Sequence, residues 1–293
     1  MKSSALQRVA ALSLAWVVGS LLGMPLFMDQ ALARRLERVE CGVGVAYVGV
    51  RQRIEPEAGI AWHDFNGTHA FFDGKSSIQT QSIGLGMFAP VTIDAMVEIE
   101  AFFEQRASPP QHDVSLLAGV ETTALLVERD YRPVELNNVL VQPLHEPIEI
   151  SVPGLRTRIC GPDDGQRWLD TATAGWSDDP DISPVIRRLG HISLMNPVMT
   201  HFLVERDGVP IAAAALAIHE GVALLAGAST IPSGRRLGAQ NLVLGARLVE
   251  ARRRGCDLAM MVATPGSSSQ RNAERRGFRV AYSRTKWQRR ARA

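Results

Sequence analysis

The sequence has little of the features by which secreted or nucleic-acid-binding proteins are often recognised. It contains only three cysteines, Cys41, Cys160 and Cys256, which are odd in number and widely spaced, so they predict no disulfide framework. Its 32 basic and 30 acidic residues give a formal net charge of +2. Because so small a charge favours no particular polyanion, we expect no nucleic-acid partner.

Several motifs of familiar enzyme classes are also absent. The sequence has no Gly-x-x-x-x-Gly-Lys-Ser/Thr loop and no Gly-x-Gly-x-x-Gly dinucleotide fingerprint. It has no Gly-x-Ser-x-Gly nucleophile elbow, and no group of His, Cys and Asp has the spacing of metal ligands. These absences argue against a P-loop nucleotidase, a Rossmann dehydrogenase and a serine hydrolase, and we expect no metal cofactor.

The composition is that of an ordinary globular protein. Hydrophobic residues make up 46% of the chain and charged residues 21%. A chain of 293 residues is long enough for two domains, each with its own core.

The most informative stretch is 227–240, which reads Gly-Ala-Ser-Thr-Ile-Pro-Ser-Gly-Arg-Arg-Leu-Gly-Ala-Gln. The apolar run 222–228 before it predicts a strand, Pro232 and Gly234 turn the backbone, and Gly238 stands where a helix would begin. Free N–H groups and the helix dipole at such a helix start attract anions. A glycine there lets the backbone approach the ligand closely. The pattern predicts a site for a phosphate-bearing ligand.

The residues after this stretch continue as alternating helices and strands. A helix is predicted over 239–254 from the spacing of its apolar residues, and Gly255 ends it. A buried parallel strand over 258–263, a second helix from 267–269 to 276 and a final strand over 279–287 follow. Three antiparallel strands, over 199–206, 209–218 and 222–228, come before the loop.

This order, together with two short motifs, resembles the GNAT superfamily of N-acetyltransferases. Residues 235–240, Arg-Arg-Leu-Gly-Ala-Gln, are similar to its acetyl-CoA pyrophosphate loop, usually Arg/Gln-x-x-Gly-x-Gly/Ala. Arg235 and Gly238 match that loop, whereas Gln240 departs from it. The helix ending in Gly277-Phe278 carries Asn272, which matches an Asn that approaches the pantetheine arm. The resemblance covers about residues 148–290.

The resemblance implies a mixed α/β fold and an acetyl-CoA-dependent N-acetyltransferase. Its acceptor would be an amine of a small-molecule or amino-acid-like compound. It also implies that backbone N–H groups near Ser229 and Thr230 hold the acetyl oxygen. The pyrophosphate would be held by the side chains of Arg235 and Arg236 and by backbone N–H groups. Those N–H groups belong to Leu237, Gly238, Ala239 and Gln240.

The residues that would transfer protons are poorly marked in the sequence. Many members of the superfamily carry a Tyr four residues before the Gly of Gly-Phe, and here that position is Ala273. Glu205 and Tyr282 are the candidates we name, although a packing role on the last predicted strand fits Tyr282 better. The missing Tyr leaves open an alternative, a non-catalytic acyl-CoA-binding or regulatory protein.

The acceptor would bind near residues 163–190, where the superfamily has two helices and a connecting loop. This stretch holds two tryptophans and an acidic group that would suit a cationic amine. A packed helix pair with a solvated acidic loop is the alternative. The residues concerned are Trp168, Trp176, Asp178, Asp179 and Asp181.

The first half of the chain repeats this organisation more faintly. The corner Asp130-Tyr131-Arg132 resembles Gly277-Phe278-Arg279, 147 residues later, where a predicted helix meets a predicted strand. We therefore expect two tandem GNAT-like copies, a degenerate one over 28–145 and an acetyl-CoA-binding one over 148–293, with 144–147 as the linker. Met87-Phe88-Ala89-Pro90 stands where the loop would be, and it cannot cradle a pyrophosphate in the same way.

The first 27 residues point elsewhere. Lys2 and Arg8 precede an apolar run from Val9 to Met24, which has the shape of a secretory signal or a short membrane anchor. Because acetyl-CoA is a cytosolic metabolite, we expect a cytoplasmic protein in which residues 1–27 stem from a misplaced start codon. The alternative is an exported or membrane-anchored protein, and a membrane partner is expected only if this segment is genuine. The sequence gives no indication of the oligomeric state.

Overall fold

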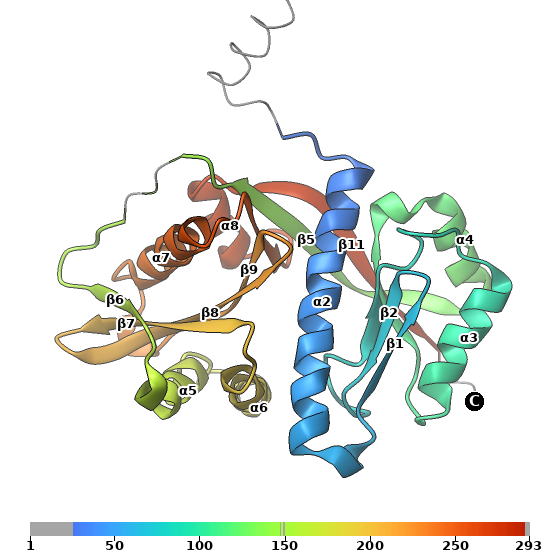
Figure 1. Ribbon diagram of the computed structural model, residues 1–293, viewed down its shortest axis with the longest axis horizontal. Coiled ribbons are helices and arrows are strands. Elements are labelled where there is room, and N and C mark those ends of the chain that lie inside the picture. The colour runs from blue at the N-terminus through green and yellow to red at the C-terminus, as the bar shows by residue number, and fades with distance from the viewer. Residues whose placement is uncertain (1–25, 147, 149, 291–293) are drawn as a thin grey trace, which may run out of the picture.

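The computed structural model describes residues 26–290 apart from 147 and 149, and here the strands form one sheet of eleven (Figure 1). The strands are β1 Ala61–Phe65, β2 Thr68–Phe72, β3 Gln81–Ile83, β4 Gln111–Ser115, β5 Tyr131–Pro143, β6 Arg156–Ile159, β7 Met199–Arg206, β8 Val209–His219, β9 Val222–Thr230, β10 Leu258–Ala263 and β11 Arg279–Arg289. The α-helices are α2 Gln30–Ile54, α3 Ile93–Glu104, α4 Val120–Glu128, α5 Gly165–Ala174, α6 Ile182–Leu194, α7 Ala239–Arg253 and α8 Ser268–Arg275.

The same series of elements occurs twice along the chain. In the N-terminal half, from α2 to β5, the order is β2, β3, α3, β4, α4, β5. In the C-terminal half, from β6 to β11, it is β8, β9, α7, β10, α8, β11. Asp130 before β5 and Gly277 before β11 both have positive φ angles, of 63° and 97°. The two helix-to-strand corners that resemble each other in sequence, at 130–132 and 277–279, therefore both begin with a residue of positive φ.

The two halves exchange their last strands. The sheet order across the centre is β4-β11-β5-β10. Strand β11 of the C-terminal half thus lies between β4 and β5 of the N-terminal half, and β5 in turn pairs with β10. Because each half completes the sheet of the other, we expect the two halves to fold and unfold together.

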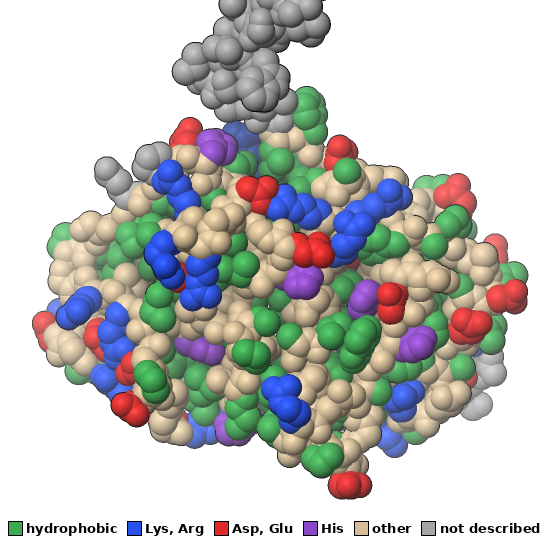
Figure 2. All heavy atoms as spheres, viewed as in Figure 1, with side chains coloured by type: hydrophobic (Ala, Val, Ile, Leu, Met, Phe, Trp, Pro, Cys, Tyr) green, Lys and Arg blue, Asp and Glu red, His purple; other side chains and the backbone are tan. Residues whose placement is uncertain are grey.

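Helices cover both faces of this sheet. Helix α7 packs on one face of β7, β8 and β9, and α5 and α6 pack on the other. Helix α2 runs across the middle of the molecule and packs with its first half on β5, β10 and β11 (Figure 1). Helices α3 and α4 cover the opposite face of the N-terminal half. On the molecular face drawn in Figure 2, basic and acidic side chains are interspersed.

A buried ionic cluster joins the two halves. The guanidinium of Arg284 on β11 lies 2.9 Å from Glu37 of α2 and 3.5 Å from Asp113 of β4, and it also pairs with Glu40. The hydroxyl of Tyr282 donates a hydrogen bond to Glu37 at 2.8 Å. Burial raises the pKa of Glu37 to about 7, against the attraction of Arg284. Three carboxyl groups thus surround one guanidinium.

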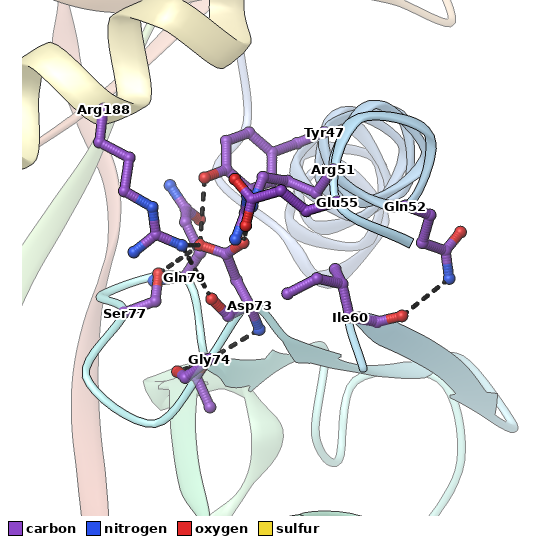
Figure 3. A network of polar contacts seen from close by, with 11 residues as sticks. Tyr47, Arg51, Gln52, Glu55, Ile60, Asp73, Gly74, Ser77, Gln79 and Arg188 are labelled. Carbon is purple, nitrogen blue, oxygen red and sulfur yellow. Dashed lines mark hydrogen bonds and ion pairs between the residues drawn. The ribbon is translucent and has the colours of Figure 1, made fainter. Parts of the chain in front are cut away.

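A second polar network links α2, the loop after β2 and α6 (Figure 3). Asp73, which is fully buried, accepts hydrogen bonds from Arg51 at 2.6 Å and from Tyr47 at 3.1 Å. Ser77 donates to the same carboxylate at 2.5 Å, and Arg188 of α6 reaches it at 3.2 Å. This network fixes the C-terminal half against the end of α2.

Two further predictions from the sequence, a helix over 30–39 and a first strand over 148–152 and 156–160, differ in the structure. Helix α2 is longer, since it continues to Ile54, and the hairpin of β1 and β2 was not predicted. The first strand of the C-terminal half is only β6, and Ile148, Ile150 and Val152 instead pack against the core cluster that includes α7. The predicted linker 144–147 begins with a buried residue, since the backbone N–H of Leu144 donates to Asp257 at 2.9 Å.

Candidate functional site

Strands β9 and β10 are parallel and part after three paired residues. Their ladder covers only 222–224 on β9 and 258–260 on β10. Beyond it, the described partners of β9 lie on β8, and those of 261–263 lie on β5. A gap therefore opens between the carboxyl ends of two neighbouring strands, at the end of the sheet where α7 begins.

The strand on one side of this gap is irregular. The register of β9 against β8 shifts between Ala226 and Ser229, and Gly227 has a φ of 57°. Such a β-bulge takes backbone groups out of the regular ladder. Further along, Ile231 donates its N–H to Ile211 of the β8 chain at 3.0 Å. Because N–H directions alternate along a strand, the N–H of Thr230 points away from β8 and toward the gap.

The start of α7 leaves backbone donors free. Gly238 is the N-cap residue, has a φ of 87° and makes no capping hydrogen bond. The helical bonds begin with Leu242, whose N–H donates to the carbonyl of Gly238 at 3.0 Å. The N–H groups of Ala239, Gln240 and Asn241 therefore have no acceptor within the helix. Free N–H groups at a helix start of this kind can bind anions.

The two arginines of the loop differ in their surroundings. Arg235 pairs with Asp178 of the loop between α5 and α6 and donates to the carbonyl of Gly175 at 3.3 Å. Arg236 is exposed, has a φ of 63° and has no acidic partner within the part of the chain that the structure describes. Arg236 is thus available to an external anion, whereas Arg235 must first leave Asp178.

Gln240 stands where the GNAT pyrophosphate loop usually has Gly or Ala, and the structure gives a reason for this difference. Its side-chain amide donates to the hydroxyl of Thr230 at 2.7 Å, which ties the end of β9 to the first turn of α7. The hydroxyl of Ser229 donates to the carbonyl of Ala172 on α5 at 2.9 Å. The Ser229 hydroxyl thus donates its proton inside the protein, whereas the Thr230 hydroxyl accepts there and keeps its own proton for another acceptor.

Two more predicted site residues are Asn272, which is exposed on α8, and Leu237, which packs against the core cluster that includes α7. Two residues that were not predicted lie at the start of α7. The guanidinium of Arg276, at the end of α8, donates to the carbonyl of Asn241 at 3.2 Å. A Cβ built on Gly238 would come within 3.1 Å of Cγ1 of Val152, so Val152 lies over the loop.

Neither candidate for proton transfer lies on the two strands that form the gap. Glu205 is at the end of β7, two strands from β9, and accepts from Arg158 at 2.9 Å. Tyr282 is on β11, two strands from β10, and belongs to the buried ionic cluster. Burial raises the pKa of the Tyr282 hydroxyl well above its usual value. The geometry therefore leaves the catalytic acid and base unassigned.

The predicted acceptor residues are largely engaged in structure. Trp168 is buried and donates its indole N–H to the carbonyl of Ala214 at 3.0 Å. Asp178 pairs with Arg235, and Asp179 accepts the N–H of Ile182 at 3.1 Å at the start of α6. Trp168, Asp178 and Asp179 therefore each have a partner within the protein.

Arg247 of α7 falls on the polar side of the helical pattern, but it is buried beside the β-bulge of β9. Arg247 is 4% exposed and donates from Nη1 to the carbonyls of Ala215 and Ala226, at 3.2 and 3.3 Å. Burial lowers its pKa to about 10. This side chain satisfies carbonyls beside the β-bulge and so supports the distorted strand.

The described residues contain neither a group of side chains that could hold a metal ion nor a helix that could span a membrane. Among 26–290, without 147 and 149, no group of three or more His, Cys, Asp or Glu could hold a metal ion. None of the helices in that same part combines the length and apolar character that a membrane span needs. The signal-like segment before Met24 lies outside the described residues.

Comparisons with known proteins support the fold. No protein-family profile matches the sequence, and no curated protein is significantly similar to it. A solved structure titled a GCN5-related N-acetyltransferase from Kribbella flavida superposes with a TM-score of 0.63 at 19% identity, covering 86% of this chain and 96% of that one. A tandem GNAT protein from the clavulanic acid biosynthesis pathway superposes with a TM-score of 0.51 at 12% identity, covering 67% of this chain and 68% of that one.

A third solved structure, a functionally unknown conserved protein from Staphylococcus epidermidis, has a TM-score of 0.54 at 7% identity and covers 81% of this chain and 96% of its own. Such likenesses at low identity establish the arrangement of the chain. The chain therefore has the GNAT fold, in two tandem copies that complete one sheet.

Proposed function

We propose that the protein is an acetyl-CoA-dependent N-acetyltransferase that acts on an amine of a small-molecule or amino-acid-like acceptor. One observation carries the proposal: the gap between β9 and β10 opens beside the uncapped start of α7. A thioester in the gap and a diphosphate at the helix start would then belong to one ligand. Residues 148–293 would form the coenzyme-binding copy, and 28–145 a degenerate one.

The chain offers two kinds of donor to a diphosphate. The first-turn N–H groups of α7 point out along the helix axis, and the exposed guanidinium of Arg236 lies just before them. Arg235 would join them by leaving Asp178. Both partners of that ion pair are largely exposed, and such pairs contribute only about 0–1 kcal/mol, so a phosphate competes readily.

The gap supplies a donor for the acyl group. The N–H of Thr230 faces it, and a fixed backbone donor of this kind stabilises negative charge that develops on a carbonyl oxygen. Removal of one such donor typically lowers a rate by about 10²–10³. The remaining contribution of the protein would be to hold the thioester and the neutral amine in line, while water takes the proton that the amine loses and supplies the proton that the leaving thiolate of the coenzyme gains.

The alternative is a non-catalytic acyl-CoA-binding or regulatory protein. Ala273, where many superfamily members have Tyr, is 1% exposed and packs in the core, and Tyr282 is held by Glu37. Neither position offers an acid to a thiolate in the gap. This observation favours the non-catalytic alternative, which a measurement of turnover would test.

Two measurements on the full chain test the proposal. Isothermal titration should detect one acetyl-CoA per chain, and Arg236→Gln should weaken it severalfold, whereas the control Arg252→Gln at the other end of α7 should not. Release of free thiol across a panel of amines should then reveal turnover. Binding without turnover would favour the alternative, and no binding would refute both.

We also propose a cytoplasmic location, because acetyl-CoA is available there, and that residues 1–27 are an upstream extension. Mass spectrometry of the native N-terminus tests this point. A chain that begins after Ala33 would show cleavage of a signal segment and contradict it.

A further inference from the structure

The N-terminal half contains a cavity of about 340 Å³ at the place that corresponds to the coenzyme gap. Strands β3 and β4 are parallel and pair over only two residues, ending with Ile83 opposite Asp113. The cavity lies beyond these strand ends, between the loop 86–91 and the start of α4. Its size is at the lower end of small-molecule pockets, about 300–1,000 Å³.

One wall of this cavity is apolar and held in place. The side chains that form it come from the loop after β3, with Ala118 opposite them. Met87 is 2% exposed. The ring of Phe88 lies 5.2 Å from the guanidinium of Arg38, and a Cβ on Gly67 would come within 2.5 Å of its Cβ. Because these neighbours fix Phe88, the wall is formed before any ligand arrives.

The cavity is lined by one unpaired base and one unpaired acid. Arg34 of α2 donates from Nε to the carbonyl of Met87 at 2.6 Å, and no carboxylate of the described residues pairs with its guanidinium. Glu121 lies in the first turn of α4 and has no ion-pair partner within the same described part. Opposite charges therefore border an apolar hollow.

This hollow does not suit the diphosphate of a coenzyme. Helix α3, which corresponds to α7, has its start closed by Thr92, whose hydroxyl accepts the N–H of Ala95 at 3.1 Å. The loop before it carries no arginine, and Glu121 would repel a phosphate. The ligand must combine a positive and a negative group with an apolar body.

We propose that this cavity binds an apolar α-amino acid. Its carboxylate would meet the Nη groups of Arg34, its ammonium would meet Glu121, and its side chain would lie against Met87, Phe88 and Val91. The degenerate copy would thus have kept the hollow at its strand ends and changed its ligand. The proposal does not depend on acetyl transfer by the other half.

The test is isothermal titration of the full chain, without acetyl-CoA, using L-leucine, L-leucinamide and N-acetyl-L-leucine. We expect one L-leucine per chain. Both derivatives, which lack the carboxylate or the ammonium, should bind about tenfold or more weakly, since each loses one charge-assisted contact. Arg34→Gln should reduce L-leucine binding about tenfold and leave L-leucinamide unchanged, and Glu121→Gln should do the same for L-leucine and N-acetyl-L-leucine.

Matched controls are Arg53→Gln and Glu128→Gln, which remove exposed charges elsewhere on α2 and α4. Thermal unfolding of every variant establishes that it is folded before binding is compared. Absence of L-leucine binding would overturn the proposal. So would binding that Arg34→Gln and Glu121→Gln leave unchanged, because the amino acid would then occupy another site such as the acceptor site of the C-terminal half.

Discussion

Replacement of Asp178 by Asn should strengthen the binding of acetyl-CoA. In the structure, the carboxylate of Asp178 holds the guanidinium of Arg235, at side-chain exposures of 61% and 42%. A diphosphate at the start of α7 must take Arg235 away from this acid. Asp178→Asn removes that competition, so the free energy of coenzyme binding should become more favourable by the free energy of the ion pair.

The size of the gain follows from the exposure of the pair. Exposed ion pairs contribute about 0.2–1 kcal/mol, which corresponds to an affinity about 1.4- to 5-fold higher. The gain should shrink as salt is added, because screening weakens the pair that the variant removes. Isothermal titration with acetyl-CoA at two salt concentrations measures both effects.

A neighbouring acid provides the control. Asp181 lies in the same loop, makes no capping hydrogen bond at the start of α6, and has no ion-pair partner in the described part of the chain. Asp181→Asn changes the net charge equally and should leave the affinity almost unaltered. In an Arg235→Gln background, Asp178→Asn should have no effect. An unchanged or lower affinity in Asp178→Asn alone would refute the assignment of Arg235 to the diphosphate.

Further predictions concern the stability of the joined halves. The pKa of Glu37 is raised from 4.5 to about 7, so its contribution to the free energy of unfolding is complete below pH 4.5 and is lost as the pH rises to about 7. Urea unfolding should therefore show a free energy of unfolding that falls by on the order of 3 kcal/mol between these pH values. Glu37→Gln should remove this pH dependence. Arg284→Gln leaves three carboxyl groups without their guanidinium and should cost about 3–5 kcal/mol in the same assay, whereas a loss below 1 kcal/mol would contradict the cluster. Gly245→Ala places a methyl group against Ile150 and should cost about 1–3 kcal/mol, and Ile150→Ala should restore part of it. Calorimetry should show one unfolding transition, and two separate transitions would contradict the strand exchange.

The elements of the C-terminal half were predictable because their signals are local. Asp207-Gly208 and Glu220-Gly221 mark the turns between apolar runs, and the structure places β7, β8 and β9 within two residues of the predicted limits. The start of α7 at Ala239, directly after Gly238, was likewise predictable. Such features depend on residues adjacent in sequence.

The N-terminal half was harder because its signals depend on packing. The helix predicted over 30–39 is only the first part of α2, which continues to Ile54 through Gly42, Gly44 and Gly49. In the structure these glycines allow close packing: a Cβ on Gly44 would come within 2.8 Å of Phe71, and Gly42 lies against His219. Asn66-Gly67 is a typical hairpin signal that could have revealed β1 and β2.

The parts of the site that sequence could not predict are long-range contacts. The pair of Arg235 with Asp178 joins residues 57 positions apart. Arg247 falls on the polar side of the helical pattern but is buried, because α7 is covered both by the sheet and by the side chains of Ile148, Ile150, Val152 and Leu155. No local pattern contains these contacts, nor the exchange of β5 and β11.

The most direct test of coenzyme binding at the start of α7 is a crystal structure of the full chain with acetyl-CoA bound. We predict that the diphosphate accepts hydrogen bonds from the first-turn N–H groups of α7 and from Arg236. We also predict that the pantetheine arm enters the gap between β9 and β10, near the N–H of Thr230. A diphosphate bound instead at the loop 84–92 before α3, or a coenzyme that avoids the gap, would contradict these predictions.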